Sequence, residues 1–254
     1  MTDYTILGSG SSGNAILVGG SRPWLIDAGL RAPLLEAHVR ACGQDPARLA
    51  GMVLTHEHAD HARGAARLSA VYGVPVYGTE GTLAALPGGD YERRPMAYGA
   101  PFSLAGATLE LFPVLHDAAE PSGVRLERAG RSLTYLTDAG QATPTLIGAL
   151  RGANHFLIES NHDPDLLRSG PYPEMLKRRI RSGHGHLSND ACGDLLAQTL
   201  TSDVRRVVLH HLSRMNNTPE LALATNHAIL HRRGLRPIEM VAAPPNGPFG
   251  PFSL

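Results

Sequence analysis

Residues 55–61 of the chain read Thr-His-Glu-His-Ala-Asp-His, and we call this stretch the histidine motif. It follows a short apolar run that predicts a buried strand, and it leads into a helical pattern. His56 and His58 leave a strand on the same side, so their imidazoles can share one cation, whereas Asp60 and His61 can reach a second cation. Zinc, manganese and iron all accept such nitrogen and oxygen ligands. The alternative interpretation is a solvated loop that happens to be rich in histidine.

Polar side chains follow four other apolar runs along the chain. These residues are Asp27, His116, Asp138 and one of the adjacent pair His210 and His211. Because chemistry collects where separate strands end on one rim, we expect these side chains to converge. A carboxylate such as Asp138 can bridge two cations that lie about 3.5 to 4 Å apart. A lone aspartate after a strand usually stabilises a turn, so the four positions indicate a metal site only together with the histidine motif.

The composition is that of a globular protein with balanced charge. The 254 residues are 43% hydrophobic, which is enough for one sizeable core. Lys+Arg and Asp+Glu both number 23, so no overall field attracts nucleic acid or anionic lipid, and anion binding needs a local patch. The two cysteines, Cys42 and Cys192, lie far apart and indicate a reducing compartment. Glycines and serines interrupt the apolar N-terminal run, so we expect a cytoplasmic protein with no signal peptide and no membrane association.

Short apolar runs alternate with helical patterns, which predicts one α/β domain over residues 1–254. Strands are expected at 5–7, 15–18, 24–26, 52–54, 74–78, 107–114, 123–128, 131–137, 155–160 and 204–209. Helices are expected at 32–41, 61–73, 144–150, 172–181, 188–200 and 219–232. The proline- and glycine-rich end of the chain, residues 243–254, predicts a loose tail.

The histidine motif and the later polar strand ends resemble the metallo-β-lactamase fold superfamily, where such residues occur in the same order. The resemblance covers nearly the whole chain and implies an α/β fold, a four-layer αβ/βα sandwich with a dinuclear metal site at one edge. It also implies that metal 1 takes His56, His58 and His116, that metal 2 takes Asp60, His61 and a late histidine, and that Asp138 bridges both. Asp27 resembles a carboxylate that orients the histidine motif without binding metal.

His210 and His211 compete for the last ligand position. Strand alternation allows only one of the two side chains to face the metals. The stretch HLSRMNN resembles the nuclease branch of the superfamily, in which the histidine directly before the hydrophobic-Ser pair is the ligand. That resemblance implies His211.

A second histidine-rich stretch, residues 182–190, precedes an expected helix. His186 with Ser188 is similar to a histidine and small hydroxyl residue of the nuclease branch, and its imidazole can protonate a departing alkoxide. The simpler alternative is that His186 only caps the helix. We expect substrate contacts from hydroxyl, amide and arginine side chains: Ser11, Asn14, Arg178, Arg179, Ser188 and Asn189. The alternative for the arginine run is a solvated helix face.

The full set of motifs, from GSGSSGNA through ESNHD to HLSRMNN, closely resembles the YycJ/WalJ-type exonucleases of this superfamily. This resemblance implies a stand-alone nuclease that acts on double-stranded DNA from the 5′ end, with two divalent cations per chain. Manganese or zinc would serve, and iron is also accepted. The interval between Asp138 and His211 is too short for the domain that β-CASP RNA nucleases insert there. Because the chain is neutral overall, DNA binding would rest on a local arginine groove.

We therefore expect a phosphodiesterase in which two cations activate a hydroxide, with Asp60 and Asp138 as catalytic ligands and His186 assisting the leaving group. The expected activity is a 5′-to-3′ exonuclease on DNA with a 5′-phosphate. Three alternatives stay open: a hydrolase of a small thioester, lactone or cyclic phosphate, a tRNA 3′-processing endonuclease, and a catalytically silent nucleic-acid binder. The sequence leaves open the metal, DNA against RNA, exonuclease against endonuclease action, cleavage polarity and the oligomeric state.

Overall fold

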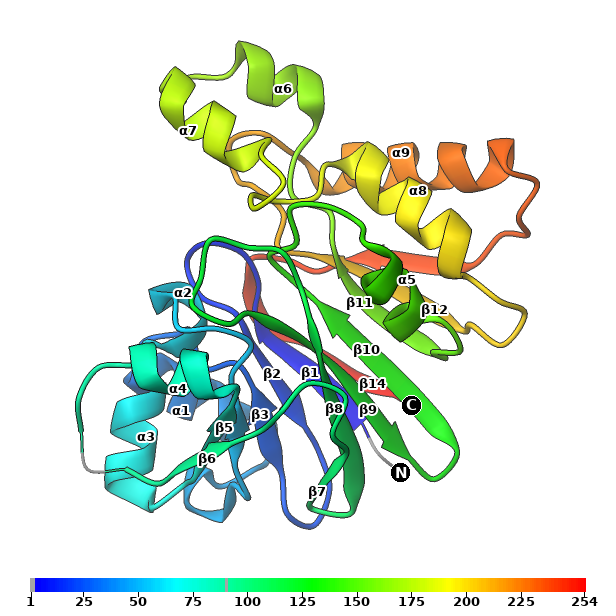
Figure 1. The fold of residues 1–254 in the computed structure, drawn as a ribbon. Coiled ribbons are helices and arrows are strands. Elements are labelled where there is room, and N and C mark those ends of the chain that lie inside the picture. The colour runs from blue at the N-terminus through cyan, green and yellow to red at the C-terminus, as the bar shows by residue number, and fades with distance from the viewer. Residues whose placement is uncertain (1–2, 90) are drawn as a thin grey trace.

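The computed structural model describes residues 3–89 and 91–254, and these form two seven-stranded sheets packed face to face (Figure 1). The first sheet has the order β14 (Asn246–Ser253), β1 (Asp3–Gly8), β2 (Ala15–Val18), β3 (Trp24–Ile26), β4 (Met52–Val53), β5 (Val76–Gly78) and β6 (Arg93–Pro95). The second has the order β13 (Glu239–Ala242), β12 (Arg206–His210), β11 (His155–Glu159), β10 (Arg131–Leu136), β9 (Ser122–Arg128), β8 (Ala107–Pro113) and β7 (Phe102–Leu104).

Helices cover the outer face of each sheet, so the molecule is the expected αβ/βα sandwich (Figure 1). The first sheet carries α1 (Ala32–Ala41), a 3₁₀ turn (Pro46–Arg48), α2 (Ala59–Ala62), α3 (Ala65–Tyr72) and α4 (Glu80–Ala85). The second carries α5 (Pro144–Leu150), α8 (Asn189–Thr199) and α9 (Pro219–Arg232). Two short helices, α6 (Pro164–Ser169) and α7 (Glu174–Ile180), lie outside these layers. No helix among the described residues is long and apolar enough to cross a membrane.

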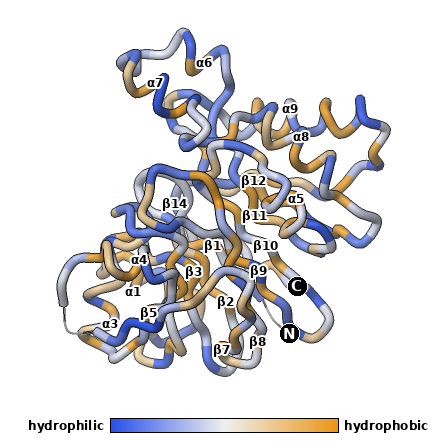
Figure 2. The backbone as a smooth tube through the Cα atoms, in the orientation of Figure 1, coloured by the Kyte–Doolittle hydropathy of each residue, from blue (hydrophilic) through white to orange (hydrophobic). Residues whose placement is uncertain are grey.

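Both sheets change from antiparallel to parallel pairing across their width. Strands β3 to β6 are parallel in the first sheet, and strands β10 to β13 are parallel in the second. The core between the sheets includes Tyr4, Trp24 and Tyr135, and hydrophobic residues are concentrated in the central strands (Figure 2). Polar residues follow the carboxyl ends of the parallel strands, where binding sites form in open α/β sheets.

The C-terminal segment is not the loose tail that its composition predicts. Residues 246–253 form β14, which pairs antiparallel with β1. Phe249 and Phe252 pack against the core between the sheets. The prolines are tolerated because β14 is an edge strand, where one row of N–H groups is not needed for pairing. Composition does not predict this strand, because its partner β1 lies about 250 residues earlier in the sequence.

The helix expected over residues 61–73 is interrupted at Gly64, between α2 and α3. The Gly64 N–H donates to the carbonyl of Ala28 at 2.7 Å. A Cβ at Gly64 would lie 2.7 Å from the carbonyl oxygen of Leu30 and 2.9 Å from that of Ala28. This close approach fixes the end of the histidine motif against the loop after β3. Strands β6, β7 and β13 and helices α4 and α6 were not expected from the sequence.

Candidate metal centre

Asp27, directly after β3, holds the histidine motif in place. Its Oδ1 accepts hydrogen bonds from the Thr55 N–H at 2.8 Å and from the Thr55 hydroxyl at 3.0 Å. Its Oδ2 lies 2.7 Å from His61 Nδ1 and accepts from the Tyr135 hydroxyl at 3.1 Å. All four side chains are buried. Because Asp27 occupies Nδ1 of His61, the other ring nitrogen, Nε2, faces the remaining site residues, which supports the orienting role inferred for Asp27.

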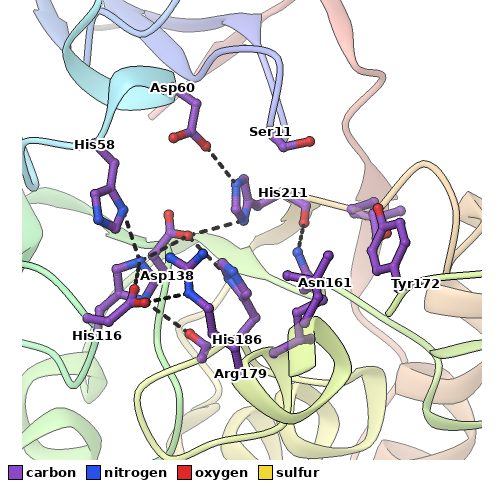
Figure 3. Close-up of a pocket in the computed structure, with 16 residues that line it drawn as sticks. Ser11, His58, Asp60, His116, Asp138, Asn161, Tyr172, Arg179, His186 and His211 are labelled. Carbon is purple, nitrogen blue, oxygen red and sulfur yellow. Dashed lines mark hydrogen bonds and ion pairs between the residues drawn. The ribbon is translucent and has the colours of Figure 1, made fainter. Parts of the chain in front are cut away.

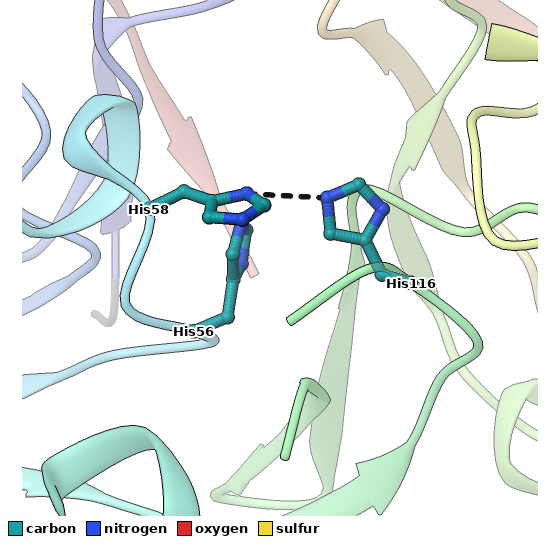
Figure 4. A group of neighbouring side chains, drawn as sticks. All are labelled: His56, His58 and His116. Atoms are coloured by element: carbon teal, nitrogen blue, oxygen red, sulfur yellow. Dashed lines mark hydrogen bonds between the residues drawn. The ribbon is translucent and has the colours of Figure 1, made fainter. Parts of the chain in front are cut away.

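His56, His58 and His116 gather in one group, which we call the histidine triad (Figure 4). Each offers a ring nitrogen, and these nitrogens lie within 4.8 Å of one another. His58 Nδ1 is 3.3 Å from His116 Nε2. Burial lowers the pKa of His56 and of His116, so both rings are neutral and have a lone pair available at neutral pH. Among the described residues, the buried Nε2 of His56 has no hydrogen-bond partner.

Asp60, His61 and His211 form a second group, which we call the mixed triad. Nε2 of His61 and Nε2 of His211 each lie 3.6 Å from Asp60 Oδ2. Burial would lower the pKa of His61, but the charges of Asp27 and Asp138 outweigh it and raise that pKa to about 10. Nε2 of His211 is buried without a hydrogen-bond partner in the described part of the chain.

Asp138 lies between the two triads. Its Oδ2 is 2.9 Å from His61 Nε2, and its Oδ1 is 3.9 Å from His116 Nε2. Asp138, Asp27 and His211 all adopt left-handed backbone conformations, with φ of 50°, 57° and 55°. Each follows a buried strand within two residues, and such unfavourable backbone conformations are typical of functional sites.

The structure places His211, and not His210, among these residues. His210 ends β12, its Nε2 donates to the carbonyl of Leu136 at 2.9 Å, and its ring stacks on Tyr135 with centroids 4.9 Å apart. His211 lies one residue beyond the strand, where the left-handed backbone turns its ring toward Asp60. His211, which the resemblance to the nuclease branch implied, is therefore the one of the two histidines that lies in the mixed triad.

Glu159, at the end of β11, is a site residue that the sequence reasoning missed. It is fully buried, and its Oε1 lies 2.8 Å from Nδ1 of both His186 and His211. Its Oε2 accepts from the N–H groups of Ala139 and Leu187. Burial opposes ionisation, but His186 and His211 lower the pKa of Glu159 to about 2. The signal was present, because Glu159 follows an apolar run in the same way as Asp27 and Asp138.

These residues fit a pair of divalent cations. Each triad presents three nitrogen or oxygen donors, Asp138 adjoins both, and unpartnered imidazole nitrogens are directed into each group. The triads border a cavity of about 280 Å³ that is also lined by His186 (Figure 3). Access from this cavity is what a catalytic metal centre needs, whereas structural metal sites are closed by protein ligands.

Comparison with known proteins identifies the family. A family model described as the beta-lactamase superfamily domain matches residues 22–212. The chain belongs to this superfamily. Exodeoxyribonuclease YycJ of Bacillus anthracis is 35% identical over 237 residues, which cover 91% of this chain and 90% of the relative. Exodeoxyribonuclease WalJ of Streptococcus pneumoniae is 35% identical over 230 residues, which cover 87% and 86%. The resemblance to the YycJ/WalJ branch is thereby confirmed, and the chain is a metal-dependent hydrolase.

Two solved structures show the same fold. The metallo-β-lactamase fold protein YhfI of Bacillus subtilis matches with a TM-score of 0.72 and 16% identity, covering 97% of this chain and 98% of that one. Zn²⁺-bound PqqB of Methylobacterium extorquens matches with a TM-score of 0.71 and 21% identity, covering 95% and 97%. The predicted four-layer architecture therefore agrees with a fold seen in solved structures.

Two of the expected substrate-binding residues, Ser11 and Arg179, line the cavity beside the metal centre. Asn14 does not, because it is buried, with its amide nitrogen 2.9 Å from His61 Nε2. Asn189 is also buried, where its amide pairs with that of Asn217. Neither asparagine lines the cavity, and the side-chain amide of each contacts other groups of the protein.

Two further expectations about the substrate side need correction. Ser188 caps α8 by accepting from the Ala191 N–H at 3.1 Å, so Ser188, and not His186, is the helix cap. Helix capping thus accounts for the Ser188 hydroxyl, which the sequence assigned to the substrate.

The arginine run on α7 is largely neutralised by carboxylates. Arg178 lies on the exposed face, 3.6 Å from Glu174, and Arg181 lies 2.9 Å from the same residue. Arg179 pairs with Asp117 at 2.5 Å. The expected arginine groove is therefore reduced to Arg179 at the cavity, and Arg178 is part of a solvated helix face.

A buried amide network supports the loops that carry Glu159 and His211. The Asn217 amide nitrogen donates to the carbonyls of Ser160 and Asn161, at 2.8 and 3.1 Å. Asn161 in turn donates to the carbonyl of His211 at 2.9 Å. A buried hydrogen-bond network of this kind restricts the local backbone, which keeps Glu159 and His211 in fixed positions.

Proposed function

We propose that the protein is a 5′-to-3′ exonuclease that acts on the 5′-phosphorylated end of duplex DNA with two divalent cations, manganese or zinc. The observation that carries the proposal is the position of Asp138 between two ligand triads beside a cavity. The 35% identity to two exodeoxyribonucleases over most of each chain supports DNA as the substrate.

In this proposal the histidine triad would hold one cation and the mixed triad the other, with Asp138 adjoining both groups of ligands. When bound, the cations lower the pKa of water and stabilise negative charge on the phosphate oxygens. The protein contributes fixed ligand positions, because Asp27 orients His61 and Glu159 orients His211.

His186 is the proposed proton donor to the leaving 3′-oxygen. Its Nδ1 lies 2.8 Å from Glu159 Oε1 and 3.2 Å from Asp138 Oδ1, so the opposite ring edge lines the cavity. Burial opposes protonation, but Glu159 and Asp138 raise the pKa of His186 to about 9. The ring is therefore charged at neutral pH and can donate a hydrogen bond to a phosphate oxygen or a proton to an alkoxide.

The decisive experiment uses end-labelled DNA duplexes and RNA, with and without a 5′-phosphate, incubated with the protein and manganese, zinc or a chelator. We expect degradation of 5′-phosphorylated DNA from its 5′ end, abolished by chelator and by His58→Ala. Val71→Ala, a change at an exposed residue of α3, is the control and should retain activity. Full metal content and activity in His58→Ala would contradict the assignment.

The same assay separates the rival functions. Cleavage of precursor tRNA with no action on duplex DNA would replace the proposal with a tRNA-processing endonuclease. Hydrolysis of small thioesters, lactones or cyclic phosphates alone would replace it with a small-molecule hydrolase. Tight DNA binding with no hydrolysis under any metal would indicate a silent nucleic-acid binder.

A further inference from the structure

The cavity at the metal centre has one apolar wall. The wall consists of side chains from the segment around α7 and from the loop after β12: Tyr172, Leu176, Ile180 and Leu212. Tyr172 lies across the cavity from His58 and His116 (Figure 3). Among the described residues that line the cavity, Tyr172 is the one Phe, Tyr or Trp. The catalytic residues do not account for this wall, because none of its members is a metal ligand or a proton donor in the proposed mechanism.

The wall is held in a fixed position relative to the metal centre. Arg179, on the same helix, pairs with Asp117, the residue that follows His116. The Lys177 ammonium is buried and donates to the carbonyl of Arg168 at 2.7 Å, which ties α7 to α6. The Asp163 N–H donates to the carbonyl of Asn216, which ties the start of α6 to the loop after β12. The ring of Tyr172 is therefore carried by a braced segment.

The two sides of the cavity require a ligand with two chemical parts. The triads, which would hold two cations, favour an anionic group such as a phosphate. The wall offers an aromatic ring and aliphatic side chains, which favour a flat apolar group. A nucleotide has both parts, and its base can stack on an aromatic side chain whatever the base. A cavity of about 280 Å³ lies just below the range of small-molecule sites, about 300 to 1,000 Å³, so it suits at most one nucleotide and not a longer segment.

We propose that the wall binds the base of the 5′-terminal nucleotide, with Tyr172 as the stacking residue, and that the enzyme releases single nucleotides. This inference rests on the proposed exonuclease function and specifies how that site recognises its substrate. Tyr172 is a specificity residue, because it contacts the base and leaves the reacting phosphate to the metal centre.

The test compares two DNA duplexes that differ only in the 5′-terminal nucleotide, which is either natural or abasic. The wild-type enzyme with manganese should degrade the natural end about tenfold faster in kcat/KM, since stacking of one base is worth roughly that factor. Tyr172→Ala should lose this preference and keep the wild-type rate on the abasic end. Tyr172→Phe should restore the preference, because the ring is retained.

Met175→Ala is the matched control, since Met175 lies on α7 with 83% of its surface exposed and does not line the cavity. It should retain the wild-type preference. Chromatography of the early products should show mononucleotides. An unchanged preference in Tyr172→Ala, or release of oligonucleotides by an active wild-type enzyme, would overturn the inference and leave the exonuclease proposal standing. Failure of the wild-type enzyme to degrade any DNA would instead refute the exonuclease proposal, and the inference with it.

Discussion

The two triads of the metal centre differ in how they are supported. In the mixed triad, both imidazoles bond to a fully buried carboxylate, His61 to Asp27 and His211 to Glu159. In the histidine triad the Nδ1 partners are uncharged: His116 Nδ1 lies 3.2 Å from the carbonyl of Gly185, His56 Nδ1 lies 3.1 Å from the Thr55 hydroxyl, and His58 is half-buried. Fixed imidazoles and nearby negative charge both favour cation binding. We therefore expect the mixed triad to bind its cation more tightly, and the histidine triad to fill second.

The largest effect should come from removing the residue that the triads share. Asp138→Ala should lower DNA hydrolysis by more than about a thousandfold, since residues that only orient a ligand already cost roughly 10- to 100-fold. Mass spectrometry of the intact protein should show loss of bound metal from both sites. Retention of two cations with full activity would show that Asp138 bridges nothing.

His186 lies outside both triads, so its removal should separate catalysis from metal binding. His186→Ala should lower kcat by about 10²- to 10⁴-fold, the usual contribution of a general acid, with metal content unchanged. Rapid-quench assays and elemental analysis on the same preparation measure both quantities. A loss of metal in this variant would make His186 a ligand and would contradict its role as proton donor.

Asp27→Asn tests the difference between the triads directly. The change weakens the hydrogen bond to His61 Nδ1, so the affinity of the tighter cation should fall by about 10- to 100-fold. Asp27 also accepts from the Thr55 hydroxyl, which lies 3.1 Å from His56 Nδ1, so calorimetric titration with manganese should show a large loss of affinity in one step and a smaller loss in the other. If both steps weakened equally, the support would not be specific to the mixed triad.

The smallest effect is expected in the amide network. Asn217→Ala removes three buried donor contacts and should lower the free energy of unfolding by about 1 to 3 kcal/mol. Because the network supports the loops of Glu159 and His211, the cation of the mixed triad should also bind a few-fold more weakly. Thr199→Ala, which removes a buried hydroxyl that donates to carbonyls within α8, is the control and should lower stability without changing either titration step.

Much of the fold and the centre could be predicted because their signals are local. Short apolar runs mark β2 and β3 with the observed bounds, and helices α1, α5 and α9 were bounded correctly by proline and glycine punctuation. The histidine motif and Asp138 each follow such a run, and their side chains lie together in the structure, whereas the choice of His211 over His210 came from the resemblance and not from the run. The role of Glu159 was missed because a carboxylate at a strand end has many uses until its partners are known.

The misplaced residues share a different cause. Asn14 was assigned to substrate because it ends a glycine-rich stretch, and Asn189 because it begins the helix after His186, but tertiary packing buries both. The strand β14 was hidden by its prolines, since its pairing with β1 joins residues 250 positions apart. Contacts over such separations are set by the assembled sandwich, which a single sequence pattern does not contain.

The pairing of β14 with β1 also determines where the protein can be permuted or attached to a surface. Asp3 lies opposite Ser253, and the Ser253 hydroxyl donates to Asp3 Oδ1 at 2.8 Å. The paired ends of β1 and β14 lie at the foot of the sandwich, away from α6 and α7 (Figure 1). A short glycine linker between them would permit circular permutation, and a tether at either terminus would attach the enzyme to a surface with its cavity open to solution.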